Sequence, residues 1–146
     1  HNLRIIEKYD KLPKLSVDPK LFRIILQNLI SNAIKYTPGR GTVTVSITRQ
    51  QGGREKEENV LIMVRDTGYG IPKNQQGKIF TKLFRADNVL LKETEGTGLG
   101  LYIVKSIVEQ SGGAIWFESE EDKGTTFYVT LPFKEMKAKA GGKKLS

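Results

Sequence analysis

Three short motifs, each rich in glycine or amide side chains, interrupt the apolar pattern of this chain in a fixed order. The first is segment 28–36, NLISNAIKY, the second is 66–72, DTGYGIP, and the third is 96–101, GTGLGL. A pair of carboxamides, a carboxylate between glycines and a glycine-rich helix start are parts that can together hold a magnesium nucleotide. Each motif is weak alone, but their order indicates a nucleotide site.

Hydrophobic periodicity between the motifs predicts two long helices. The first begins at Asp18-Pro19, an N-cap followed by a proline at the first helical position, and stops near Pro38-Gly39. The second covers 99–111 and closes at Gly112-Gly113. We expect four of its side chains to face inward: Ile103, Val104, Ile107 and Val108.

Alternating and continuous apolar runs predict about five strands. They are expected at 3–9, at 42–48, at 60–64, around Ile115 and Phe117, and from Phe127 to Phe133. The run 60–64 is uninterrupted, which predicts a central strand covered on both faces. A loop is expected at 50–59, a short helix within 73–84, and a turn at 122–124. The fold class is therefore α/β, a two-layer sandwich with a mixed sheet and helices packed on one face.

Length and charge fit one domain with a basic tail. The chain has 146 residues and a net charge of +8. Residues 134–146 hold five lysines and one glutamate, so half of the excess charge lies on a segment without hydrophobic pattern. We expect a domain over 1–133 and a flexible tail over 134–146. Nucleic-acid binding would rest on this charge alone, and no base-stacking aromatic pattern accompanies it.

The residues needed for zinc binding and for histidine-activated nucleophiles are missing. The chain has no cysteine, and its one histidine is the terminal His1, so zinc sites and Ser-His or Cys-His nucleophiles have no ligand or base. No apolar run approaches the roughly 18 residues that a membrane-spanning helix needs, and no signal peptide is visible.

Asn28, Asn32 and Lys35 are spaced four and three residues apart, so they project from one stripe of the first helix. An asparagine oxygen is a hard neutral ligand that suits a magnesium ion sharing its coordination with phosphates and water. A neighbouring lysine would neutralise those phosphates. Taken alone, the stripe is more typical of ordinary polar positions on a helix.

Asp66 directly follows a predicted buried strand and precedes Gly68 and Gly70. Burying a carboxylate costs several kcal/mol unless donors satisfy it, and the exocyclic amine of adenine is such a donor. Glycines beside it would let a flat base approach the backbone. A plain strand-ending turn uses the same residues and is an equal alternative.

The glycines of the third motif are not completed by Lys-Ser or Lys-Thr, so they do not form a Walker A loop. They follow a charged segment and not a strand, which excludes a dinucleotide fingerprint. We interpret them as the hinge of a lid over 86–95.

These motifs resemble the N, G1, F and G2 boxes of sensor histidine kinases. The matching segments are 28–38, 66–72, 79–87 and 96–101, and GTTF at 124–127 through Leu131-Pro132 is similar to the closing strand of that family. The resemblance runs from Asp18 to Phe133 and implies the ATP-binding fold shared by gyrases and histidine kinases. It implies ATP and Mg²⁺ as cofactors.

The resemblance also implies roles for single residues. Asn32 would bind magnesium with Asn28 beside it, and Lys35 would contact phosphate. Tyr36 would line the pocket, and Asp66 would bind the adenine amine. The pocket and lid would further use Gly68, Gly70, Ile71, Gly96, Thr97, Gly98, Leu99 and Gly100, with Thr125 or Thr126 near the base and Arg85 as a candidate phosphate contact.

Two departures from the family pattern qualify these roles. The F box has Thr81 and Leu83 where the family has Glu and Phe, although Phe80 and Phe84 keep the apolar anchors. A phosphoacceptor histidine followed by an acidic residue is absent from this sequence. The chain therefore resembles the ATP-binding half of a kinase, cytoplasmic and monomeric alone. Its expected partners are a histidine-containing dimerisation domain of the same protein and, indirectly, a response regulator.

Two alternatives differ in chemistry. ATP-hydrolysing relatives place a glutamate as general base four residues before the magnesium asparagine, where this chain has Asn28. Losing such a base costs roughly 10²–10⁴-fold in rate, which favours transfer to a histidine. A docking module without catalysis is the second alternative, and the intact Asn32, Asp66 and glycines argue against it.

Overall fold

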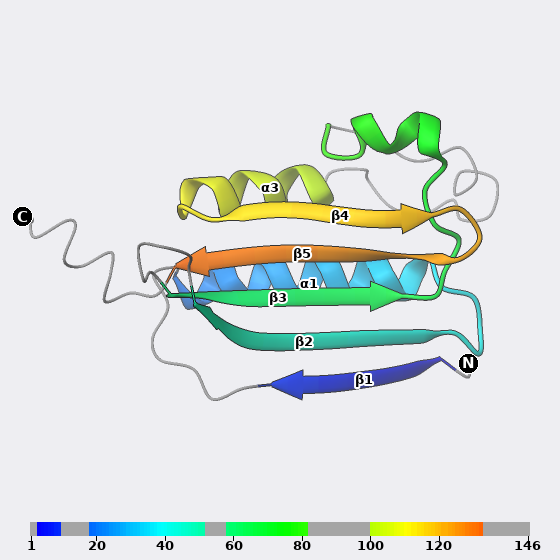
Figure 1. Ribbon diagram of the computed structural model, residues 1–146, viewed down its shortest axis with the longest axis horizontal. Coiled ribbons are helices and arrows are strands. Elements are labelled where there is room, and N and C mark those ends of the chain that lie inside the picture. Colours follow the sequence, from blue (N-terminus) through cyan, green and yellow to red (C-terminus); the bar gives the residue numbers. More distant parts are fainter. Residues whose placement is uncertain (1–2, 10–17, 52–57, 82–99, 133–146) are drawn as a thin grey trace, which may run out of the picture.

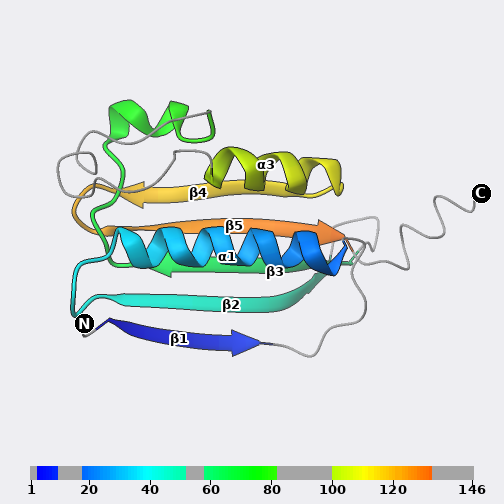
Figure 2. The same cartoon turned by 180° about the vertical axis from the view of Figure 1, so that it is seen from behind.

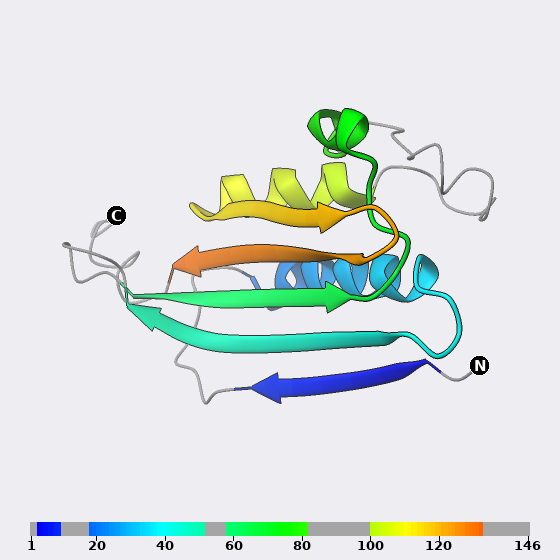
Figure 3. The ribbon, with the colours of Figure 1, turned by 45° about the vertical axis from the view of Figure 1, so that its right-hand side comes forward.

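The computed structural model describes residues 3–9, 18–51, 58–81 and 100–132. They form one five-stranded sheet with two helices on the same face, as Figure 3 shows. The strands are β1 (Arg4–Tyr9), β2 (Thr42–Gln51), β3 (Glu58–Asp66), β4 (Ala114–Glu120) and β5 (Gly124–Pro132), and the helices are α1 (Pro19–Lys35), α3 (Gly100–Gln110) and the short 3₁₀ helix η1 (Lys73–Lys78). The predicted two-layer α/β sandwich is confirmed.

The sheet is mixed because one strand pair is parallel. Its order is β1-β2-β3-β5-β4, and β1 runs parallel to β2 while the other pairs are antiparallel (Figure 1). The connection from β1 to β2 passes through α1, as a parallel pair requires a long crossover.

α1 begins where the sequence predicts. The Asp18 side chain accepts a hydrogen bond from the Lys20 N–H at 2.7 Å, and Pro19 occupies the first turn. The helix ends at Lys35, and the Thr37 hydroxyl donates to the Ala33 carbonyl at 2.6 Å. This side-chain bond satisfies one carbonyl that the last turn leaves without a helical partner.

The core lies between the helices and the sheet. Its buried residues from the helices are Ile25, Leu29, Ala33, Val104 and Val108, and those from the central strands are Val43, Val45, Ile47, Val60, Ile62, Val64, Phe127, Val129 and Leu131. α1 lies lengthwise over β3 and β5 on this face (Figure 2). Val104 and Val108 are buried as predicted and Ile107 packs against the core, but Ile103 is 39% exposed, so its predicted inward orientation is wrong.

Three strand predictions need correction. β2 and β3 extend to Gln51 and from Glu58, so the connecting loop is shorter than the predicted 50–59. β3 is central, but the described helices cover only one of its faces, where Val60, Ile62 and Val64 are buried. Its alternate residues Leu61 and Met63 are half-buried on the open face. The continuous apolar run therefore reflects a central position and not two covered faces.

The segment after η1 is held by aromatic contacts. The Phe80 ring packs edge-on against Phe117 and Phe127, with centroids 5.9 and 6.3 Å apart. Lys105 of α3 places its Nζ 5.2 Å from the centre of the same ring. Phe80 is thus the apolar anchor that the sequence predicts, whereas Phe84 lies outside the described residues.

Candidate functional site

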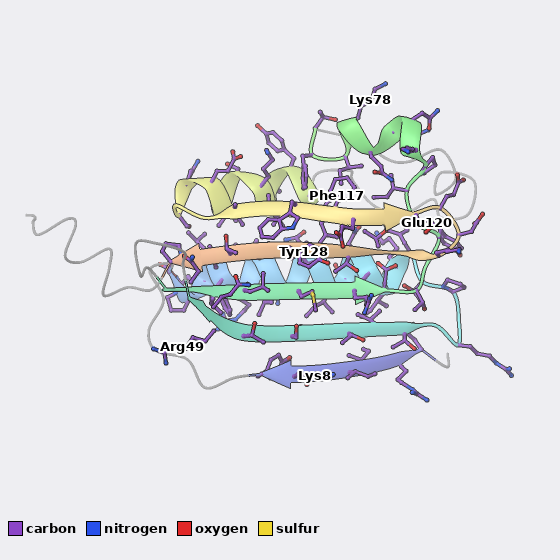
Figure 4. All side chains as sticks on the ribbon, viewed as in Figure 1. Lys8, Arg49, Lys78, Phe117, Glu120 and Tyr128 are labelled. Carbon is purple, nitrogen blue, oxygen red and sulfur yellow. The ribbon has the colours of Figure 1, made fainter. Side chains whose placement is uncertain are left out.

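Three of the predicted site segments meet at one end of the sheet. The last turn of α1, the tip of β3 and the turn between β4 and β5 all lie at this end, on the right in Figure 1. Figure 4 labels Glu120 where β4 ends, at the same end as the tip of β3. Segments that are far apart in the sequence are therefore close together in the fold.

Asp66 is the last residue of β3 and faces the helix side of the sheet. Its Oδ1 accepts hydrogen bonds from the Gly68 N–H at 2.9 Å and the Thr125 N–H at 3.2 Å. Burial raises the pKa of Asp66 to about 6, and these two hydrogen bonds act in the opposite direction. Both donors in the described part of the chain use Oδ1, so a ligand donor would meet Oδ2.

A chain of backbone hydrogen bonds joins the three segments. The Tyr69 N–H donates to the Tyr36 carbonyl at 3.1 Å, and the Asp122 N–H donates to the Tyr69 carbonyl at 2.6 Å. Tyr36 caps α1, Tyr69 belongs to the loop after β3, and Asp122 belongs to the β4–β5 turn. The loop 66–72 is therefore fixed between the helix end and the hairpin.

The glycines of this loop are explained by the protein's own backbone. A Cβ at Gly68 would collide with the Tyr36 carbonyl oxygen, and a Cβ at Gly70 would collide with the Glu120 carbonyl oxygen. Gly70 also has a φ of 70°, which an L side chain rarely adopts. These contacts give both glycines a reason within the fold itself, because they let the loop pack tightly. The predicted approach of a base beside them stays a prediction.

Asn28 lies beside the start of α3. Its Nδ2 donates to the Ile24 carbonyl at 2.8 Å, and a Cβ at Gly100 would lie 3.0 Å from its Oδ1. The first motif and the last glycine of the third are therefore neighbours. The N-terminus of α3, which favours anions, thus lies next to the asparagine stripe.

Asn32, Lys35 and Tyr36 follow on the last turn of α1, and each is half-buried. The Asn32 carbonyl accepts from the Tyr36 N–H at 3.1 Å, so the turn is still regular where the stripe ends. Asn28, Asn32 and Lys35 therefore lie on one continuous helix, so their spacing places them on one side of it, as the sequence predicts.

Strand register distinguishes the two candidate threonines. Thr125 pairs with Asp66 across β3 and β5, whereas Thr126 pairs with Arg65. Because successive residues of a strand face opposite sides, Thr125 shares the face of Asp66 and Thr126 lies on the other face. The register therefore places Thr125, and not Thr126, beside Asp66, and a role of either threonine near the base stays a prediction.

Two residues that sequence reasoning missed hold Ile71 in the loop after β3. The predicted role of Ile71 in the pocket stays a prediction. The Ile71 N–H donates to Ser119 Oγ at 2.8 Å, and Gln76 Nε2 donates to the Ile71 carbonyl at 3.0 Å. A single serine in a strand and a glutamine in a polar segment carry no sequence signal, because only the fold brings them together.

The remaining predicted site residues, Arg85, Gly96, Thr97, Gly98 and Leu99, lie outside the described residues, as does the predicted lid 86–95. In the described ranges, no three His, Cys, Asp or Glu side chains are grouped so that they could hold a metal ion. None of the described helices is long and apolar enough to span a bilayer.

Comparison with known proteins agrees with this geometry. The family model described as histidine kinase-, DNA gyrase B- and HSP90-like ATPase matches residues 17–135. Sensor histidine kinase WalK of Bacillus subtilis is 45% identical over 121 residues, which make up 83% of this chain and 19% of WalK. The circadian input-output histidine kinase CikA of Synechococcus elongatus is 41% identical over 115 residues, 79% of this chain and 14% of CikA. The chain spans less than a fifth of these curated relatives.

Solved structures of histidine kinases have the same fold. The mycobacterial sensor histidine kinase MprB superposes with a TM-score of 0.74 at 25% identity, covering 89% of this chain and 83% of that one. Full-length ShkA in complex with AMPPNP superposes with a TM-score of 0.72 at 30% identity, covering 90% of this chain and 26% of ShkA. The chain belongs to the histidine kinase-, DNA gyrase B- and HSP90-like ATPase family, as the ATP-binding domain that sensor histidine kinases carry.

Proposed function

We propose that this domain binds Mg-ATP and supplies the γ-phosphate to a histidine on a separate dimerisation domain of the same kinase. The observation that carries the proposal is Asp66, a largely buried carboxylate at the meeting point of α1, β3 and the β4–β5 hairpin. A response regulator would receive the phosphoryl group afterwards. The reaction belongs in the cytoplasm, where ATP is available.

Asp66 supports recognition of adenine. With a pKa of about 6, the carboxyl is mostly ionised at neutral pH and accepts hydrogen bonds only. The exocyclic amine of adenine would donate to it and compensate its burial. Guanine carries a carbonyl oxygen at the corresponding position, and this oxygen would face the carboxylate without a proton between them. Binding should therefore select ATP over GTP.

The asparagine stripe supports a magnesium role. Asn32 offers an amide oxygen of the type that magnesium accepts, and the ion would complete its shell with phosphate oxygens and water. Asn28 lies one turn earlier with its Oδ1 toward the start of α3, and Lys35 lies in the last turn of α1. Bound there, magnesium would neutralise charge on the phosphates during transfer.

Asn28 argues against ATP hydrolysis as the main activity. Its Nδ2 donates to the Ile24 carbonyl, so the side chain is used as a fixed amide and offers no proton acceptor of useful basicity. Positioning and charge neutralisation would then suffice only for a nucleophile that needs no strong base, such as a neutral imidazole.

Calorimetric binding of ATP, ADP and GTP, with and without magnesium, tests the proposal. We expect Asp66→Asn to weaken ATP binding about 100-fold, because an amide donor then faces the adenine amine. Asn32→Ala should remove the magnesium-dependent part of the affinity and abolish phosphorylation of a supplied histidine-containing domain. Asn74→Ala, at an exposed position of η1, is the matched control and should bind as the parent does.

Unchanged phosphorylation by Asn32→Ala would contradict the magnesium assignment. Folded protein that binds no nucleotide would favour the docking-module alternative instead.

A further inference from the structure

We propose that Ser119 and Gln76 are positioning residues for nucleotide selectivity, holding the loop after β3 against the β4–β5 hairpin so that Asp66 faces the base. The proposal rests on the proposed function, since it assumes that Asp66 recognises adenine. Neither residue belongs to the three motifs.

Ser119, Thr125 and Asp66 form one row across the sheet. Ser119 pairs with Thr125 between β4 and β5, and Thr125 pairs with Asp66 between β5 and β3. Directly paired residues point to the same face, so the three side chains lie side by side on the helix face. Ser119 is therefore two strands away from the carboxylate and linked to it through Thr125.

The Ser119 hydroxyl is fully used by this row and the adjacent loop. It accepts from the Ile71 N–H at 2.8 Å, donates to the Gly124 carbonyl at 3.1 Å, and lies 2.8 Å from Thr125 Oγ1. A hydroxyl has one proton. That proton goes to Gly124 or to Thr125, so either hydroxyl of the Ser119–Thr125 pair can be the donor. One oxygen thus joins the loop, the turn and the start of β5.

Gln76 completes the attachment from η1. Its Nε2 donates to the Ile71 carbonyl at 3.0 Å and to the Ser119 carbonyl at 3.2 Å. Both backbone polar groups of Ile71 are therefore held, one by Ser119 and the other by Gln76. Ile71 also packs against the core, so its position is fixed by polar and apolar contacts together.

The attachment reaches the carboxylate through the backbone of Thr125. The residue is 7% exposed, and its N–H donates to Asp66 Oδ1. On the other side, a Cβ at the neighbouring Gly124 would collide with the Asp66 carbonyl oxygen. A shift of the hairpin therefore moves a donor of Asp66 directly, and with it the direction in which Oδ2 points.

The ratio of ATP to GTP affinity tests this role, because a merely structural residue would leave the ratio unchanged in folded protein. We expect Ser119→Ala to lower ATP affinity about tenfold, an effect of the size of one lost hydrogen bond, with little change for GTP. Gln76→Ala should act in the same direction, and Ser119→Thr, which keeps the hydroxyl, should restore the ratio. Glu118→Gln is the matched control, since Glu118 bonds the Tyr128 hydroxyl on the other face.

The outcomes separate the two proposals. If Asp66→Asn binds ATP like the parent, adenine recognition by Asp66 is wrong and the proposed function fails. If Asp66→Asn loses ATP but folded Ser119→Ala and Gln76→Ala keep the parent ratio, only the positioning proposal is overturned. A ratio that falls in both alanine variants and returns in Ser119→Thr supports it.

Discussion

Asp66 illustrates how a buried carboxylate can lower the stability of the domain that carries it. Its pKa is raised from 3.8 to about 6, chiefly by burial. The folded state therefore holds the proton more tightly than the unfolded chain does. By linkage, the free energy of unfolding decreases as pH rises from about 4 to above 6 and is constant beyond.

We expect Asp66→Asn to be more stable than the parent at neutral pH and nearly equal to it below pH 4. The difference above pH 7 should be on the order of 2–3 kcal/mol, since one pKa unit corresponds to about 1.4 kcal/mol. Urea unfolding of both proteins between pH 4 and 8 measures it. A difference that does not change with pH would contradict the burial of this carboxylate.

At the residue scale, sequence reasoning predicted what a side chain can do better than what it touches. Asp66 was predicted as a binding carboxylate because of its position after an apolar run. The choice between Thr125 and Thr126 needed the strand register, which no local pattern contains. Ser119 and Gln76 were missed for the same reason, since Ser119 lies 48 residues from Ile71 and 43 residues from Gln76, and only the fold brings the three together.

Among the elements, α1 offers a test of which contacts stabilise the fold. Leu29 is 1% exposed in the core, and Leu21 on the same helix is 36% exposed. We expect Leu29→Ala to cost about 2–5 kcal/mol through lost burial and a cavity. Leu21→Ala, the matched control, should cost less than about 1 kcal/mol. Urea unfolding at neutral pH measures both, and equal losses would contradict the assigned core.

Helices and strands were predicted correctly where one strong sequence pattern marked them. Strand ends and the borders of the buried helix face were predicted less well. The N-cap and proline predicted the start of α1 at the correct residue. The polar residues 50, 51, 58 and 59 predicted a loop, yet pairing between β2 and β3 continues through them, because backbone hydrogen bonds do not depend on side-chain polarity. Ile103 was misplaced because only a narrow stripe of α3 faces the core, centred on Val104 and Val108.

For the whole molecule, the single tryptophan provides a test of cooperativity. Trp116 lies on the edge strand β4 and stacks on Tyr128 of β5, with ring centroids 5.3 Å apart. Because β5 also supplies Phe127 and Val129 to the common core, the hairpin cannot detach without exposing that core. We expect tryptophan fluorescence and far-UV circular dichroism to report the same urea midpoint.

Adding saturating Mg-ATP should move both midpoints upward together, since a ligand that binds only the folded state stabilises all of it. An earlier fluorescence midpoint would mean that the β4–β5 hairpin unfolds separately from the rest of the sheet. The domain would then unfold as two cooperative units and not as one.

The parallel pairing of β1 also determines how the domain responds to mechanical tension. Arg4 opens β1 at the end of the sheet where Asp66 lies, and Pro132 closes β5 at the opposite end (Figure 1). A pull between these two residues is directed along the strands, so it shears the hydrogen bonds between β1 and β2 simultaneously and does not unzip them one by one. The sheet should therefore resist tension between Arg4 and Pro132 until the hydrogen bonds between β1 and β2 fail together.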